Sequence, residues 1–253
     1  MGDMPSLSII VPALNEEMNL KPTMSSLIDV LDKGKIDWEI ILVNDGSSDS
    51  TAHIAEQLIK NNSRIRLINH EQPRGIGACF RDGIRTSTKE AVTWFPADGE
   101  NNPDELIKYL SLIEKVDIVI PFVVNRDVRP WARRFVSRLY LMIVNLSFGT
   151  MFNYTTGNVI YRRKVFDVVK FKASGFIYQT ECLVRSVRAG FTFAEVPVLL
   201  GQRSHGKSKI LTFRSVMTQV FVFMKLFIDI HFSRNTEEKA DSPAIYERRL
   251  THG

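Results

Sequence analysis

The chain has 253 residues, of which 44% are hydrophobic, and it carries a formal net charge of +5 at pH 7. This length is sufficient for one large hydrophobic core or two small ones, and ordinary Gly and Pro contents exclude a collagen-like or low-complexity chain. The only two cysteines, Cys79 and Cys182, lie far apart in the sequence, which disfavours a disulfide framework and a structural zinc site. The net charge is positive, but no recognition-helix, RRM-like or zinc-finger pattern accompanies it, which disfavours nucleic acid as a partner.

The first half of the chain alternates short β-rich runs with amphipathic segments. Its first 20 residues contain three carboxylates and one short apolar run, which is not typical of a secretory signal. Such alternation predicts an α/β fold with a mostly parallel sheet flanked by helices, in which ligands bind beyond the carboxyl ends of the strands. The pattern predicts strands at residues 7–11, 38–43, 64–68 and 91–95, and helices at 16–33, 50–61, 75–87 and from Pro103.

The loops expected at those carboxyl ends are acidic and rich in short polar side chains. They read PALNEE, NDGSSDST and PADGE, and neither a GxGxxG nor a GxxxxGK[ST] motif is present. This disfavours a dinucleotide oxidoreductase and a P-loop NTPase. Gly75 and Gly77 form a lone GxG that equally suits a tight turn into a helix. Acidic loops of this kind can instead hydrogen-bond a ribose or base and hold a hard divalent cation through oxygen.

The second half is more apolar and more basic. It predicts a strand at 117–122, an Arg-rich stretch, and then helices at 135–152 and near 178–189, a strand at 193–200 and a helix at 211–232. A basic segment of this kind is also typical of an ordinary solvated face. The last helix carries Arg214, Lys225 and Asp229 among its apolar residues, which disfavours a membrane span. Its Phe-rich face, with Phe223 and Phe227, favours a helix in the membrane interface, although a helix packed on the domain or in a dimer explains the pattern nearly as well.

Six motifs, in this order and spacing, resemble family 2 glycosyltransferases of the GT-A (Rossmann-like) fold, and among them the dolichyl-phosphate or polyprenyl-phosphate mannose synthases. They are IIVPALNEE, VNDGSSDST, PADGE, TGNVIYRRKVFD, FIYQTECLVRSVRAGFTFAEVPV and RSHGKSK, and the resemblance covers residues 6 to 215. It implies a catalytic domain at 1–210, an amphipathic membrane-interface helix at 211–232 and a polar, flexible tail at 233–253. It also implies a peripheral enzyme on the cytoplasmic face of a membrane, either homo-oligomeric or with a membrane partner subunit.

The implied reaction transfers one sugar, with mannose favoured, from a nucleotide-diphosphate sugar to a polyprenyl or dolichyl phosphate, with inversion. The family's acidic loop usually reads Asp-x-Asp, and here Pro96 replaces its first carboxylate. The resemblance nevertheless assigns Asp98 and Glu100 to a divalent metal, Mg²⁺ or Mn²⁺, which typically takes one or two carboxylates together with phosphate oxygens.

The same resemblance assigns the remaining site residues. A phosphate acceptor is already anionic near pH 7, because its second pKa is about 6, so it requires cations and no general base. The implied acceptor-phosphate residues are Arg126, Arg133 and Ser137, the nucleotide-sugar residues are Pro12, Asn15, Glu16, Asp45, Gly75, Asp98, Arg203 and Lys209, and the catalytic residues are Asp98, Arg133, Arg203 and Glu181.

Two alternatives remain open at this stage. A transferase acting on a polysaccharide or another hydroxyl acceptor would need a carboxylate base, for which Glu181 is the candidate, while a helix-surface carboxylate is an equally good interpretation of that residue. A binding or scaffold protein that lost catalysis through Pro96 is the other alternative.

Overall fold

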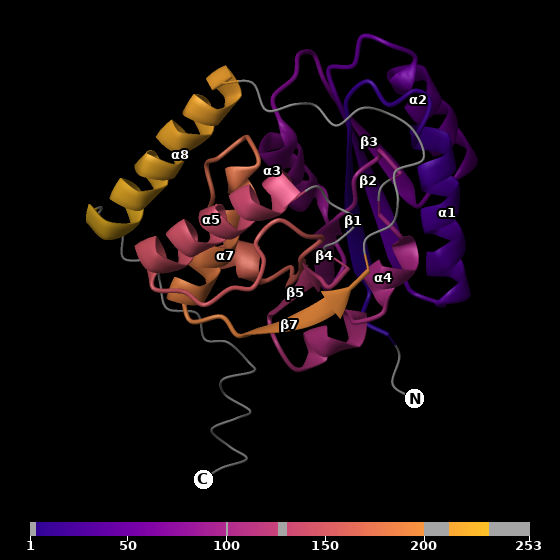
Figure 1. Ribbon diagram of the computed structural model, residues 1–253. Coiled ribbons are helices and arrows are strands. Elements are labelled where there is room, and N and C mark those ends of the chain that lie inside the picture. The colour runs from indigo at the N-terminus through magenta and orange to yellow at the C-terminus, as the bar shows by residue number, and fades with distance from the viewer. Residues whose placement is uncertain (1–3, 100, 126–130, 200–212, 233–253) are drawn as a thin grey trace.

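The computed structural model describes residues 4–99, 101–125, 131–199 and 213–232. A seven-stranded sheet in the order β3-β2-β1-β4-β6-β5-β7 forms its centre (Figure 1). Its strands are β1 (Leu7–Ala13), β2 (Trp38–Asp45), β3 (Ile65–His70), β4 (Ala91–Trp94), β5 (Ile118–Val123), β6 (Ile160–Arg162) and β7 (Phe193–Val198). Among these strands only β6 pairs antiparallel with its neighbours. The prediction of an α/β fold with a mostly parallel sheet is therefore confirmed.

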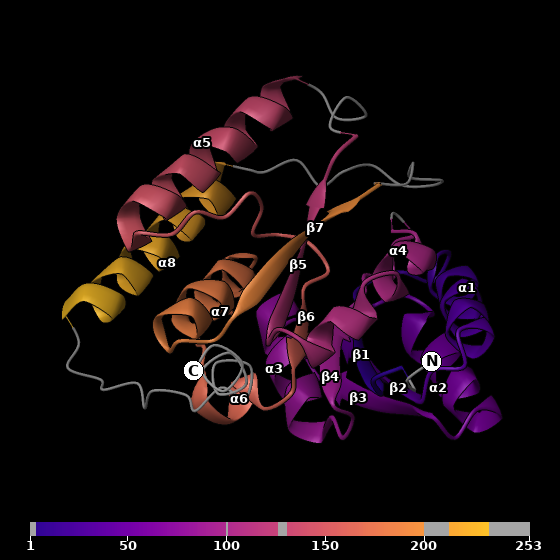
Figure 2. The same cartoon turned by 90° about the horizontal axis from the view of Figure 1, so that it is seen from below.

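Helices cover both faces of the sheet (Figures 1 and 2). Alternate residues of β1 point to opposite faces, so Ile9 joins one core and Ile10 the other. The Ile9 core is covered by α1 (Leu20–Lys33), α2 (Thr51–Asn61), α4 (Pro103–Ile107) and the 3₁₀ helix η1 (Leu110–Glu114). The Ile10 core is covered by α3 (Ile76–Thr86), α5 (Trp131–Phe148), α6 (Val165–Val168), α7 (Ile177–Arg188) and α8 (Phe213–Phe232).

The helix expected at 135–152 starts and ends about one turn earlier, as α5. Its end is set by Gly149, whose φ of 65° a glycine adopts without strain. Asn145 then fixes the chain that leaves the helix: its side-chain oxygen accepts from Phe152 N at 3.0 Å, and its amide donates to Phe152 O at 3.0 Å. The basic residues before 135 consequently belong partly to the helix and not to a separate loop.

The closing helix, α8, packs against α5 and α7 (Figure 2). The Phe148 ring of α5 lies 5.5 Å from Phe223 and 6.2 Å from Phe227, centroid to centroid, and His231 Nε2 is 2.8 Å from Ser147 O. The expectation that Phe223 and Phe227 face a membrane is therefore wrong, because both rings pack on the domain. No helix in the described part of the chain combines the length and apolarity that crossing a bilayer requires. The tail at 233–253 lies outside the described residues.

Candidate active site

The parallel strands deliver the acidic loops to one edge of the sheet. β1, β2, β3 and β4 all run in the same direction, so the segments that follow them leave from the same side. Most of the described residues that the sequence assigned to donor binding come from these segments: Pro12 is the penultimate residue of β1, Asp45 ends β2, and Asp98 follows β4.

Two of the sequence motifs are joined directly to each other. Asn15, after β1, has a φ of 55°, which asparagine tolerates better than most residues. Its side-chain oxygen accepts from Ser48 N at 2.8 Å, and its own N–H donates to Ser47 Oγ at 3.1 Å. The N–H of Glu16 donates to Thr51 Oγ1 at 2.8 Å. The loop after β1 and the loop after β2 therefore form one hydrogen-bonded unit.

Asp45 is buried at the end of β2 and organises the turn into α3. One carboxylate oxygen accepts from Arg74 N at 2.8 Å and lies 2.7 Å from His70 Nδ1, and the other accepts from Gly75 N at 2.9 Å. Burial opposes ionisation of this carboxyl group, but the hydrogen bonds from His70, Arg74 and Gly75 outweigh it and hold its pKa below the usual value of 3.8. Asp45 thus remains a carboxylate that shapes the loop.

His70 and Asp82 belong to this network and were not singled out from the sequence. His70 Nε2 lies 3.2 Å from Asp82 Oδ2, and Asp82 also pairs with Arg74 at 2.8 Å. The signal that pointed to them was weak, since a histidine at a strand end and an aspartate in a helix are ordinary features. Their effect is to fix the backbone that carries Arg74 and Gly75.

One oxygen, nitrogen or sulfur atom each from Asp45, His70 and Cys79 lies within 4.8 Å of the others, which is a spacing that metal ligands can have. Burial raises the pKa of the Cys79 thiol, and the neighbouring Asp45 carboxylate raises it further, so in the absence of a cation this group is a neutral thiol. Asp45 is also engaged by two backbone N–H groups. We interpret this cluster as a buried hydrogen-bonded network.

Gly75 and Gly77, the two glycines of the GxG, allow the start of α3 to lie close to residues 173–174. Gly75 has a φ of 89°, and a Cβ there would lie 2.6 Å from Ser174 O. A Cβ at Gly77 would lie 2.3 Å from Ala173 O, and Gly77 N donates to Ser174 O at 2.7 Å. Gly75, expected in nucleotide binding, uses its own N–H to hold Asp45. Both glycines are therefore explained by packing of the α3 start against residues 173–174.

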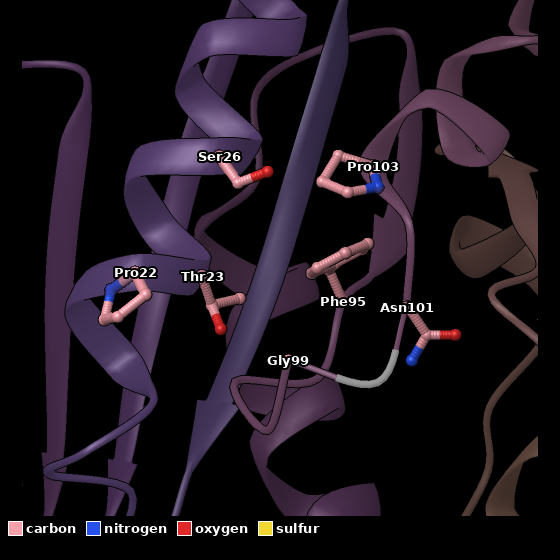
Figure 3. A pocket seen from close by; sticks show the side chains of 7 residues that line it. All are labelled: Pro22, Thr23, Ser26, Phe95, Gly99, Asn101 and Pro103. Carbon is pink, nitrogen blue, oxygen red and sulfur yellow. The ribbon is translucent and has the colours of Figure 1, made fainter. Parts of the chain in front are cut away.

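The loop after β4 is anchored at two buried residues, Phe95 and Ala97, just before Asp98. Phe95 N donates to Ile10 O at 2.9 Å, and Thr23 of α1 donates from its hydroxyl to Ala97 O at 3.2 Å. Asp98 itself is half-buried. A pocket of about 170 Å³ lies beside this loop, lined by Pro22, Thr23, Ser26, Phe95, Gly99, Asn101 and Pro103 (Figure 3). Asp98 is not among the described residues that line it, although its neighbour Gly99 is.

Glu181 lies in the middle of a structural network. It is 3% exposed; one oxygen accepts from Lys172 N at 3.1 Å and Ala173 N at 2.8 Å, and the other accepts from Arg185 Nε at 2.9 Å. The interpretation of Glu181 as a helix-surface carboxylate is wrong, because α7 is buried along most of its length. The contacts also explain the residue without a role as a base.

The remaining predicted residues are placed only in part. Ser137 is half-buried in α5, and Arg133 lies in the first turn of that helix by its backbone, while its side chain is outside the described part of the structure. The other four predicted positions lie outside the described residues: Glu100, Arg126, Arg203 and Lys209. Their assignments stay predictions.

Two curated relatives act on polyprenyl-type phosphates by name. The chain is 26% identical over 215 residues to the polyprenol monophosphomannose synthase of Mycolicibacterium smegmatis, with 80% of each chain covered. It is 34% identical over 124 residues to a dolichyl-phosphate beta-glucosyltransferase of Trichomonas vaginalis, with 45% of this chain and 37% of that protein covered. The chain thus spans about a third of the second relative.

Solved structures of glucosyl-3-phosphoglycerate synthase from Mycobacterium tuberculosis share the fold. One complex with UDP has a TM-score of 0.66 at 20% identity, covering 89% of this chain and 79% of that one. Another, with Mn²⁺, UDP and phosphoglyceric acid, has a TM-score of 0.64 at 21% identity, covering 88% and 78%. At this identity the likeness establishes the GT-A fold. The model of glycosyl transferase family 2 matches residues 8–170, which is more than half of the sequence, and the chain therefore belongs to that family.

Proposed function

We propose that this glycosyltransferase moves a hexose from a nucleoside diphosphate sugar to the phosphate of a polyprenyl lipid at a membrane surface. The observation that carries the proposal is the place where α5 begins. It follows β5, which runs parallel to β4 and so ends at the same edge of the sheet as the acidic loops, and most of the exposed residues of α5 are apolar. A lipid phosphate has its reactive group at headgroup level, so a site for it requires an apolar surface beside it. The two relatives named above support the same acceptor class.

The donor side is assigned to the loops after β1, β2 and β4. Their carboxylate and amide oxygens suit a hard divalent cation such as Mg²⁺ or Mn²⁺, and half-buried Asp98, with Glu100, would hold it. When bound, such an ion supplies positive charge against the leaving diphosphate. The loop pair of Asn15 and Ser48, fixed by its own hydrogen bonds, is assigned to the nucleoside. Structural neighbours crystallised with Mn²⁺ or Mg²⁺ and UDP are in accord with this arrangement.

The acceptor side relies on cations. An acceptor phosphate oxygen forms a bond to the anomeric carbon, the bond from that carbon to the diphosphate oxygen breaks, and the nucleoside diphosphate leaves with the electron pair, with inversion. The match to the family motifs assigns Arg126 and Arg133, with Ser137, to the acceptor phosphate, and Arg203 and Lys209 to the leaving diphosphate. No proton has to be removed from an anionic phosphate.

The contacts of Glu181 disfavour transfer to a hydroxyl acceptor. General-base activation of a hydroxyl requires a side chain near the acceptor with an atom free to accept the proton, and Glu181 was the candidate that the sequence offered. Both oxygens of Glu181 are already engaged, one by Arg185 and one by two backbone N–H groups. This supports the phosphate acceptor over a polysaccharide.

The membrane-facing surface is assigned to the exposed apolar residues of α5 and α8. On α8 the exposed apolar residues do not include Phe223 and Phe227, which pack on the domain. Lys225 is exposed on the same helix, where its ammonium group can meet anionic headgroups. The exposed apolar residues are Trp131, Phe135, Val136, Leu139, Met142, Ile143 and Leu146 on α5, and Val220, Phe221, Met224, Ile228 and Phe232 on α8.

The double variant Phe221→Ser/Met224→Ser is expected to bind anionic vesicles about 30-fold more weakly. Each side chain loses roughly 1 kcal/mol if half of its full burial energy is realised in the interface. Co-sedimentation with phosphatidylglycerol vesicles measures the change, and wild-type binding should weaken as salt rises. Phe221 is 71% and Met224 50% exposed, so folding should be unaffected.

The matched control is Phe223→Ser/Phe227→Ser on the same helix. These rings pack on Phe148, so this variant should lower the free energy of unfolding by about 1–3 kcal/mol. A Phe221→Ser/Met224→Ser protein that binds vesicles normally and changes from a dimer to a monomer would assign this surface to self-association and contradict the membrane proposal.

The proposed function is tested with a panel of donors and one defined acceptor. Thermal unfolding is measured with GDP-mannose, UDP-glucose and other nucleotide sugars, each with and without Mn²⁺, because a ligand that binds the folded state raises its stability. Transfer of the labelled sugar to a short polyprenyl phosphate is then measured. Mannose is the first sugar to test, since the synthase matched over 80% of both chains is a mannose synthase, and glucose is the second. Donor protection without transfer would favour the binding or scaffold protein.

A further inference from the structure

The segment of residues 172–175 packs tightly against the start of α3. The contact is made through backbone atoms, since Gly77 N donates to Ser174 O at 2.7 Å. At both Gly75 and Gly77 a Cβ would overlap carbonyl oxygens of this segment. Gly75 in turn holds Asp45 through its N–H at 2.9 Å. Residues 172–175 are therefore connected, through Gly75, to Asp45 at the end of β2.

The same segment contacts α8 on its other side. A Cβ at Gly175 would lie 3.0 Å from the side-chain amide nitrogen of Gln219, and Lys172 Nζ lies 3.9 Å from Asp229 Oδ1. The side-chain oxygen of Gln219 is buried without a hydrogen-bond partner among the described residues. Residues 172–175 therefore lie between α8 and the start of α3.

A buried chain of charges links these two contacts. Asp229 of α8 pairs with Arg185, Arg185 pairs with Glu181 at 2.9 Å, and Glu181 accepts from the N–H groups of Lys172 and Ala173. The side chains of Arg185 and Glu181 are 8% and 4% exposed. Buried charges require their partners. A shift of Asp229 therefore obliges Arg185 and Glu181 to adjust, and Glu181 holds the backbone of the segment.

We propose that Arg185 is a positioning residue that couples the position of α8 to the loop after β2. Binding of α8 to the membrane would thereby change the affinity of the protein for the nucleotide. The coupling runs from Asp229 through Arg185 and Glu181 to residues 172–174 and then to Gly75 and Asp45. It rests on the proposed function, in which the exposed face of α8 meets the membrane and the loops after β1 and β2 take the nucleotide.

The test measures nucleotide affinity with and without phosphatidylglycerol vesicles. The probe is the nucleoside diphosphate of the best donor in the panel above, with the full chain in every arm. Coupling between two sites is typically 5–150-fold and reciprocal, so we expect at least a 5-fold change in nucleotide Kd on adding vesicles and the same factor in vesicle affinity on adding nucleotide. In the Asp229→Asn variant, vesicles should leave the nucleotide Kd unchanged, which corresponds to a coupling factor of about one, while the variant still binds vesicles.

The matched control is Asp29→Asn, which removes the same charge from an exposed pair with Lys33 on α1 and should keep the wild-type factor. If Asp229→Asn does not fold, Arg185→Lys replaces it. Lysine keeps the positive charge but lacks the guanidinium group that reaches both Glu181 and Asp229. The coupling factor of this variant should therefore lie between one and the wild-type value. A lower melting temperature with an unchanged factor in either variant would mean that these residues only hold the fold, and would overturn the proposal.

Amide hydrogen exchange separates failure of this inference from failure of the proposed function. Vesicle binding should change exchange at residues 172–175 and 74–77 even without nucleotide. A wild-type protein that binds neither vesicles nor nucleotide contradicts the proposed function. A protein that binds both, with no change in exchange and no change in Kd, contradicts the coupling alone.

Discussion

Asp98→Asn is expected to reduce sugar transfer by about 10²–10³-fold, which is the typical cost of removing one group that stabilises developing charge. Asp98 follows β4, the strand between β1 and β6, and its loop is anchored by Phe95 and Ala97, so the isosteric amide should leave the fold intact. Since Pro96 supplies no carboxylate, the loop depends on Asp98 and Glu100 for its charge. Divalent-dependent nucleotide binding, measured by calorimetry with and without Mn²⁺, should be lost or greatly weakened.

The control for this variant is Asp104→Asn. Asp104 is an exposed carboxylate in the first turn of α4, six residues further on, and its removal changes the net charge equally. It should leave the metal dependence unchanged. Glu100→Gln should behave like Asp98→Asn. Unchanged metal dependence in both of these variants would show that the divalent ion, and with it the donor diphosphate, is held elsewhere.

The sheet and its helices were predictable because they depend on local periodicity. All eight residues of β2 are buried, and α1 buries Leu20, Met24, Leu27 and Leu31 at helical spacing, so both patterns are visible in the sequence. The direction of the strands determines at which edge of the sheet the following loops lie. Alternation of strands and helices predicts parallel strands, whose following loops share one edge. For this reason the sequence could predict that the loops after β1, β2 and β4 share one edge of the sheet, while their role in donor binding stays a prediction.

Contacts between the loops were not predictable in the same way. The bond from Ser48 N to Asn15 joins residues 33 apart and depends on the register that pairs Ala13 with Asn44. Motif spacing carries no information about that register. The network of Asp45, His70 and Asp82 is a further example, since the ends of β2 and β3 must meet α3 before its hydrogen bonds exist.

Glu181 and the α8 phenylalanines show how burial changes the meaning of a residue. Arg185 at the fourth position after Glu181 is a helix-pair signal that could have indicated an ion pair. Nothing local shows that α7 is buried almost all round, or that Phe223 faces Phe148 while Phe221 faces solvent. An apolar helix presents a broad face in sequence, and only packing divides it into a domain side and an exposed side.

Arg133→Ala is expected to lower turnover with polyprenyl phosphate by about 10–100-fold, because a hydrogen-bonded pair with a charged group contributes about 1.5–3 kcal/mol. Arg133 lies in the first turn of α5, beyond β5, where an acceptor phosphate would sit next to the exposed apolar residues of that helix. Donor binding should be retained. Arg133→Lys should recover only part of the activity, since an ammonium group lacks the bidentate fork that matches a phosphate. Acceptor KM, kcat and nucleotide Kd are measured for each variant.

Arg138→Ala provides the matched control, because Arg138 is exposed on the same helix and its removal changes the charge near the membrane by the same amount. A loss of vesicle attraction alone would affect both variants equally and would diminish at high salt. A phosphate contact would instead affect Arg133→Ala specifically and would persist with a short, water-soluble acceptor. Equal loss of donor and acceptor binding in Arg133→Ala would mean that this residue holds the diphosphate or the fold, and the acceptor assignment would then pass to Arg126.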